Sequence, residues 1–134
     1  MGKSLIQIVN TSTQAVAVDG TISLGTALRR YGCNLRLNGD AIEAEGAGYY
    51  TIDGTVTVAP TAAGVVTVAV YVDGLPLAGA TASANVATAG NAVTLPLCGT
   101  IRQGCCYDSA NSITVVLESG AGNVTNVSLR VEKS

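Results

Sequence analysis

The chain has 134 residues and a formal net charge of −2, and only 12% of its residues are charged. This length has room for one domain, which we expect to span residues 1–134 with flexible ends at 1–3 and 133–134. The absence of His excludes mechanisms that use an imidazole as a base, a proton shuttle or a metal ligand. The acidic balance argues against a nucleic-acid partner, and no apolar run reaches the roughly 18 residues that a membrane span requires.

The first half of the chain has the pattern of short extended segments separated by turns. Asp19-Gly20 and Asn38-Gly39 are typical of two-residue hairpin turns, and Gly25 indicates a bulge or a bend. The strands predicted by alternation of apolar and polar residues cover 4–9, 15–18, 22–28, 35–37 and 41–44.

The second half predicts longer strands. Segment 65–72 is the most apolar, and both of its faces are apolar or neutral, which favours burial on both sides. Asp73-Gly74 predicts a turn, and Pro96 predicts an edge position or a bulge because proline cannot donate a ladder hydrogen bond. The strands predicted here cover 49–58, 65–72, 91–102, 113–117 and 124–131, with 80–87 as a weak strand, 75–77 as a segment that crosses an edge and 60–64 as a loop.

These segments amount to about eight to ten strands with no helix of note. The abundance of β-branched residues, with 17 Val and 15 Thr, agrees with that count. We therefore predict an all-β fold, a sandwich or barrel of antiparallel strands. Because charges are so sparse, we also expect much of the surface to be an interface.

Four cysteines are present: Cys33, Cys98, Cys105 and Cys106. Adjacent Cys105 and Cys106 are poorly placed to bond each other, and no Cys-x-x-Cys spacing indicates zinc. We expect free, partly buried thiols, with two disulfides as the less favoured alternative.

No catalytic or metal-binding pattern emerges from the sequence. Glu43 and Glu45 lie two residues apart and could be interpreted as a glycosidase pair, but a solvated strand face explains them better. The Asp residues stand beside Gly turns, without the Asp-x-Asp-x-Asp cluster of a calcium loop. We expect neither enzymatic activity nor a cofactor or metal.

Several segments together resemble a known family. A Gly-x-Tyr strand is followed by a Val-rich hairpin and then by a closing strand that ends in Lys. The segments are VAVDGTI at 16–22, AGYYTI at 47–52 with VTV at 56–58, VAVYVDGLPLAGAT at 68–81 and VSLRVEK at 127–133. In this order the chain resembles the tumour-necrosis-factor-like, or complement globular-head-like, jelly roll over nearly its whole length. The most similar members known cap bacterial collagen-like filaments and phage fibres.

The resemblance implies an antiparallel jelly-roll β-sandwich that assembles as a homotrimer, with subunits packed edge to face around a threefold axis. In such trimers aromatic and aliphatic residues of the inner sheet meet at the axis. The interface candidates by this resemblance are Tyr49, Tyr50, Tyr71, Leu117 and Leu129.

Two hypotheses of function follow. The first is a structural protein of a phage or prophage virion, a trimeric capsid decoration, head-fibre or appendage protein made in the bacterial cytoplasm without a signal peptide. Its capsid contact is expected in the N-terminal strand, through Ser4, Leu5, Ile6, Gln7, Ile8, Val9 and Asn10. The second is a trimeric module that binds a cell-surface glycan or protein through loops 60–64, 75–79 and 104–111.

Overall fold

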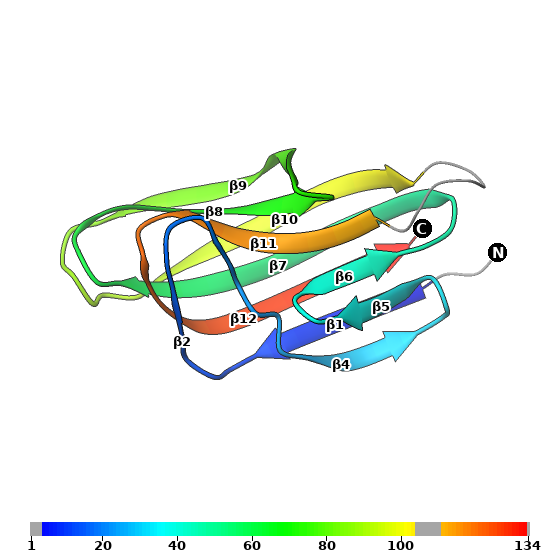
Figure 1. Cartoon of the computed structure of the whole chain (residues 1–134), viewed down its shortest axis with the longest axis horizontal. Coiled ribbons are helices and arrows are strands. Elements are labelled where there is room, and N and C mark those ends of the chain that lie inside the picture. The colour runs from blue at the N-terminus through cyan, green and yellow to red at the C-terminus, as the bar shows by residue number, and fades with distance from the viewer. Residues whose placement is uncertain (1–3, 104–110, 134) are drawn as a thin grey trace.

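The computed structural model describes residues 4–103 and 111–133, which form two antiparallel sheets packed face to face (Figure 1). No helix occurs among these residues, and so none that could cross a membrane. The strands are β1 Ser4–Asn10, β2 Gln14–Val16, β3 Gly20–Thr21, β4 Thr26–Tyr31, β5 Leu35–Asn38, β6 Ala41–Ala44, β7 Gly48–Pro60, β8 Gly64–Val72, β9 Leu75–Val86, β10 Val93–Gln103, β11 Asn111–Ser119 and β12 Gly122–Lys133.

Sheet A has the strand order β10-β7-β12-β1-β4, with the short β2 paired to β12. Sheet B has the order β5-β6-β11-β8-β9, with β3 paired to β11. The predicted all-β antiparallel sandwich is confirmed. The described residues form twelve strands instead of the expected eight to ten, because two strands, β3 and β4, replace the predicted strand 22–28, and because the weak segment 80–87 joins 75–77 in the full strand β9. Lys133, expected in a flexible end, is paired with both Ser4 and Tyr50.

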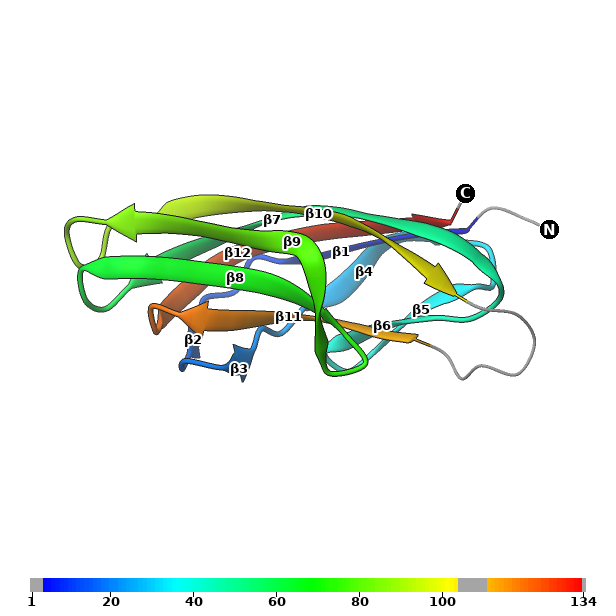
Figure 2. The same cartoon turned by 90° about the horizontal axis from the view of Figure 1, so that it is seen from above.

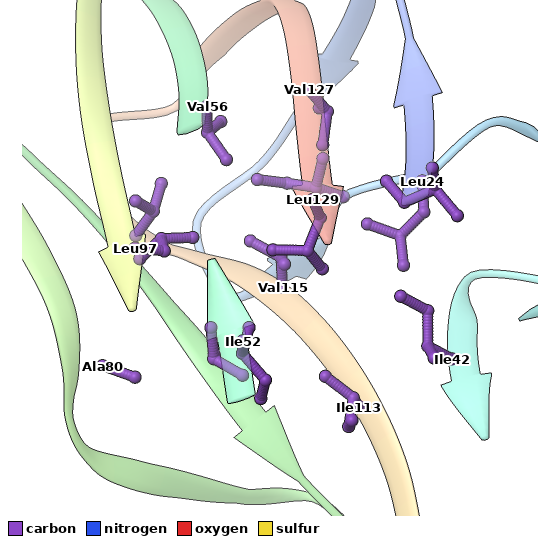
Figure 3. Close-up of a cluster of buried hydrophobic side chains, with 14 of the residues drawn as sticks. Leu24, Ile42, Ile52, Val56, Ala80, Leu97, Ile113, Val115, Val127 and Leu129 are labelled. Carbon is purple, nitrogen blue, oxygen red and sulfur yellow. The ribbon is translucent and has the colours of Figure 1, made fainter. Parts of the chain in front are cut away.

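An aliphatic core fills the space between the sheets. Every second residue of each central strand points inward, as the two-residue period of a strand requires. Figure 3 shows Ile52, Val56, Leu97, Val127 and Leu129 from sheet A facing Ile42, Ala80, Ile113 and Val115 from sheet B. Among the described residues, Tyr50 is the only aromatic side chain in the core. Branched aliphatic side chains therefore supply nearly all of the apolar burial that holds the sheets together.

Two of the three predicted turns are hairpins. Asp73 and Gly74 both have positive φ, as a type I′ turn requires, and they join β8 to β9. Asn38-Gly39 lies at the hairpin that joins β5 to β6. Asp19-Gly20, in contrast, joins no paired strands: β2 before it belongs to sheet A and β3 after it to sheet B. The Asp19 amide donates to the Leu117 carbonyl at 2.7 Å, so this turn fixes a crossing between the sheets.

Strand β9 closes one side of the sandwich. Its ladder with β8 shifts register between Ala69 and Tyr71, and Figure 2 shows the sharp bend in β9. Beyond the bend β9 approaches β10, where Leu77 and Ala80 pack on Gly99. Pro96 lies in β10, which is an edge strand of sheet A, as predicted. The bend therefore joins the edges of both sheets on this side.

Gly54 tests how tightly β7 packs on β12 within sheet A, and Gly99 tests how tightly β10 of sheet A packs on β9 of sheet B. A Cβ at Gly54 would lie 2.9 Å from Leu129 Cα and closer still to the Ser128 carbonyl oxygen, both of them backbone atoms. A Cβ at Gly99 would meet Leu77 Cδ2 at 2.9 Å, the movable end of a side chain. We expect Gly54→Ala to lower the free energy of unfolding by about 1–3 kcal/mol, and Gly99→Ala by under about 1 kcal/mol. Urea unfolding at one protein concentration measures both, and equal losses would contradict this packing.

Candidate interaction surfaces

The outer face of sheet A is a flat surface that is rich in hydroxyl groups. The register aligns three rows of outward-facing residues across β1, β12, β7 and β10. The rows are Leu5-Glu132-Thr51-Thr100, Gln7-Arg130-Asp53-Cys98 and Val9-Ser128-Thr55-Pro96. We call these twelve residues the A face. Only three of them carry a charge, so this surface can be dehydrated at low cost by a partner that satisfies its hydroxyl groups.

An ion pair lies in the middle row of the A face. Arg130 Nη2 donates to Asp53 Oδ2 at 2.8 Å, and this hydrogen bond raises the pKa of Arg130. Both side chains are about half exposed. Beside the pair is a shallow hollow of about 240 Å³, lined by Gln7, Asp53, Gly54, Thr55, Ser128 and Arg130. This hollow presents amide, hydroxyl and charged groups to any surface that covers the A face.

The side of the sandwich closed by β9 carries no charge. Residues 74–101, which include all of β9 and most of β10, contain no Asp, Glu, Lys or Arg. Ala, Gly, Thr, Ser and Asn dominate this stretch, so its surface is smooth as well as neutral. We call it the neutral edge. The sequence shows this absence of charge, but the alternation within each single strand does not reveal that these residues lie along one side of the molecule.

The outer face of sheet B is more polar. Arg36 contacts Glu43 at 2.8 Å and Glu45 at 3.0 Å, and Asn38 donates to Glu43. The hydrogen bonds from Asn38 and Arg36 lower the pKa of Glu43. This network agrees with the prediction that Glu43 and Glu45 occupy a solvated strand face.

Tyr71 spans part of the same face and covers a small apolar area. Its hydroxyl donates to Glu118, and the Ala69–Val116 pair lies in the register between them. Ala69 is fully buried although it points away from the core. The hydrogen bond to Glu118, together with burial, raises the pKa of Tyr71. The predicted burial of β8 on both sides therefore arises partly within the chain, from the tyrosine ring.

Three of the expected trimer-interface residues belong to the core. Tyr50 and Leu117 are fully buried within the chain, and Leu129 is 1% exposed. The Tyr50 hydroxyl lies 2.8 Å from the carbonyl oxygens of Glu45 and Gly46. These side chains have no exposed surface with which to contact a second subunit. They are core residues, and their prediction as interface residues is wrong. Tyr49 is 56% exposed on the sheet A side, and Tyr71 is half-buried on sheet B.

The expected capsid-contact strand is an inner strand of sheet A. β1 lies between β12 and β4, and Ser4, Ile6 and Ile8 are fully buried. The remaining residues of the strand, Leu5, Gln7, Val9 and Asn10, are half-buried. Because β1 completes two ladders, it is part of the fold and cannot act as a detachable arm. Only Leu5, Gln7 and Val9 reach the A face.

The expected binding loops do not form one surface. Loop 60–64 leads into the first residue of β8, whereas 75–79 follows the hairpin at the other end of β8. The nine-residue strand β8 therefore separates these two loops. Most of loop 104–111, with Cys105 and Cys106, lies outside the described residues. Cys33 and Cys98 are free thiols, and both are exposed where partial burial was expected. Within 4–103 and 111–133 no group of three or more Cys, Asp or Glu side chains is arranged to hold a metal ion.

The chain is similar in fold to several solved structures. Murine APRIL at pH 5.0 matches with a TM-score of 0.76 and 15% identity, covering 99% of this chain and 100% of the other. The globular domain of zebrafish complement 1qA matches at 0.70 with 5% identity, covering 96% and 94%. PRD1 vertex protein P5 matches at 0.60 with 10% identity, covering 98% and 96%. The fold is thus the jelly roll of these proteins, while no family model and no curated protein matches the sequence.

The Tyr71–Glu118 bond gives stability a dependence on alkaline pH. A phenol with a raised pKa holds its proton more tightly in the folded chain, so its contribution is complete below about pH 10 and is lost as pH rises through the folded pKa. We expect Tyr71→Phe to flatten the fall in stability above that pH, and Glu118→Gln to do so in part. Tyr50, whose pKa burial also raises, accounts for the remaining fall. Identical pH profiles for wild type and Tyr71→Phe in urea unfolding would contradict this.

Proposed function

We propose that this chain assembles into a homotrimer by packing the neutral edge of one copy on the A face of the next. The observation that carries the proposal is the run of 28 residues, 74–101, without a charge along one side of the molecule. Depletion of charge is typical of the buried core of a protein interface. A contact between two different surfaces closes into a ring when the rotation between copies is a fraction of a full turn. The resemblance to trimeric jelly rolls supports a rotation of one third.

The proposed contact also explains the chemistry of the A face. Its Thr and Ser hydroxyls can bond to backbone groups of a neighbouring edge strand, since β10 and β9 each have one side without a strand partner. Arg130 and Asp53 already neutralise each other's charge, so a neighbouring copy that covers them leaves no charge unpaired.

The biological role proposed for this trimer is that of a non-enzymatic structural protein of a phage virion. It would serve as a capsid decoration, head-fibre or appendage protein, made in the host bacterial cytoplasm. The likeness of fold to PRD1 vertex protein P5 over nearly the whole of both chains supports this role. The free, exposed thiols of Cys33 and Cys98 agree with assembly in a reducing compartment. A trimeric cell-surface binding module is the alternative, favoured by the higher TM-scores of murine APRIL, 0.76, and the complement head domain, 0.70, against 0.60 for PRD1 vertex protein P5.

A new charge on the neutral edge tests the assembly. Light scattering after size exclusion should give the wild type a mass of about 40 kDa, three times the chain mass of 13.4 kDa. Thr100 belongs to both the A face and the neutral edge, so Thr100→Glu places an unpaired carboxylate in the contact, and we expect it to shift the mass to one chain. Thr13→Glu adds the same charge at an exposed loop position and should leave the trimer intact. A wild-type monomer, or a trimer that tolerates Thr100→Glu, would contradict the proposal.

Purified particles test the virion role. Lysates of cells that produce the protein and its particles are separated on a density gradient, and each fraction is probed with antiserum against the chain. We expect the chain to sediment with intact particles, in a copy number divisible by three. Recovery only in the fraction free of particles would contradict the virion role, and binding of the labelled trimer to intact cells would then favour the alternative.

A further inference from the structure

The edge of sheet A opposite β10 is the most open part of the described chain. β4 ends the sheet and pairs only with β1, and Figure 1 shows it at the lower margin of the molecule. All six of its residues are exposed. The other three edge strands each bury at least one side chain in the core, such as Leu35 in β5, Ala80 in β9 and Leu97 in β10. β4 therefore extends beyond the cover of sheet B.

β4 is also basic. Arg29 and Arg30 are adjacent in sequence, and no Asp or Glu occurs between Asp19 and Asp40. In the described part of the chain, Arg36 and Arg130 are the only cationic side chains that form ion pairs. Arg30 donates to the Leu35 carbonyl at 2.7 Å, which ties β4 to β5, whereas Arg29 reaches only the neighbouring Leu28 carbonyl at 3.4 Å. Two guanidinium groups thus face solvent on a chain of net negative charge.

Exposed apolar side chains flank the arginines. Leu28 is 50% exposed and Tyr31 is 51% exposed. Leu28 is the additional residue where the β1–β4 register shifts, since Gln7 is paired with Arg29 and Ile8 with Ala27. Charged residues alone would serve to protect an edge strand from unwanted pairing, but protection does not require a Leu and a Tyr in solvent. The sequence Leu28-Arg29-Arg30-Tyr31 instead places two adjacent positive charges between two exposed apolar side chains.

We propose that β4 is a docking strand for an extended segment of a partner protein that carries adjacent acidic residues between apolar ones. The segment adds to sheet A as a further antiparallel strand, so backbone hydrogen bonds hold it and side chains select it. Adjacent carboxylates on the segment point to opposite faces and meet Arg29 on one face and Arg30 on the other. A second copy of this chain does not fit, because antiparallel pairing of two β4 strands would set arginines against arginines.

The experiment uses a short fluorescein-labelled peptide with a central Asp-Glu pair between Val and Thr residues. Fluorescence anisotropy at about 20 mM salt follows its binding to the full chain, because screening is weak there. One control peptide replaces the acidic pair with Lys-Arg. A second keeps the acidic pair but is methylated at alternate backbone nitrogens, which removes the donors of one strand edge.

We expect the acidic peptide to bind and both control peptides to bind at least about tenfold more weakly. Arg29→Glu should weaken binding of the acidic peptide by about tenfold, while Arg29→Lys stays within about threefold. The Arg29 side chain makes no hydrogen bond or ion pair with the described residues beyond its neighbour's carbonyl, so both variants should keep the wild-type mass and melting temperature. Undiminished binding of the methylated peptide, equal binding of the basic peptide, insensitivity to Arg29→Glu or no binding at all would overturn the proposal.

The methylated peptide decides the question on the wild-type chain, so the result does not depend on how any variant folds. It is also independent of the proposed trimer. β4 and β10 lie at opposite edges of sheet A, and the peptide can be titrated whether the solution mass is one chain or three.

Discussion

The packing of sheet A on sheet B depends on side chains that fill a narrow space with almost no polar group. Ile, Val and Leu from both sheets make up the core, and Tyr50 is the single aromatic ring among its described residues. The approach of the sheets is close at Gly99, where a Cβ would lie 2.9 Å from Leu77 Cδ2 and 3.3 Å from Ala80 Cβ of sheet B. Because the inner faces use most of the large apolar residues, the outer faces and edges are composed mainly of small, hydroxylated or charged ones. The character of each exposed surface thus follows from the composition of the core.

Much of the fold could be predicted from the sequence, because alternation reports directly on a half-buried strand. The β8–β9 and β5–β6 hairpins followed from Asp73-Gly74 and Asn38-Gly39. Asp19-Gly20 failed as a predictor because the same dipeptide also suits a crossing between sheets, and only long-range pairing with β11 distinguishes the two. Local turn chemistry fixes the direction of the chain, but it does not determine which sheet receives the next strand.

The candidate site residues were harder to predict. Leu117 and Leu129 share the parity of Val115 and Val127, so alternation places them on the core side once those neighbours are taken as core. Tyr50 shares the parity of Ile52 and Val56, so alternation places it on the core side, but the sequence does not show how its buried hydroxyl finds a partner. The fold resolves this by bonding the Tyr50 hydroxyl to backbone carbonyls at the β6–β7 turn. The A face emerged only from the register of four strands that are distant in sequence.

An open sandwich has four edge strands, and this chain treats its two sides differently. On one side β9 bends over β10, and residues 74–101 of these joined edges carry no charge, which lowers the electrostatic cost of covering them. On the other side β4 and β5 stay separate apart from the Arg30–Leu35 hydrogen bond, and arginines border the opening. Repulsion between arginines disfavours self-pairing on the second side, whereas nothing opposes it on the first. This distribution of charge disfavours contact between copies at β4, and there it favours a partner of opposite charge over a second copy.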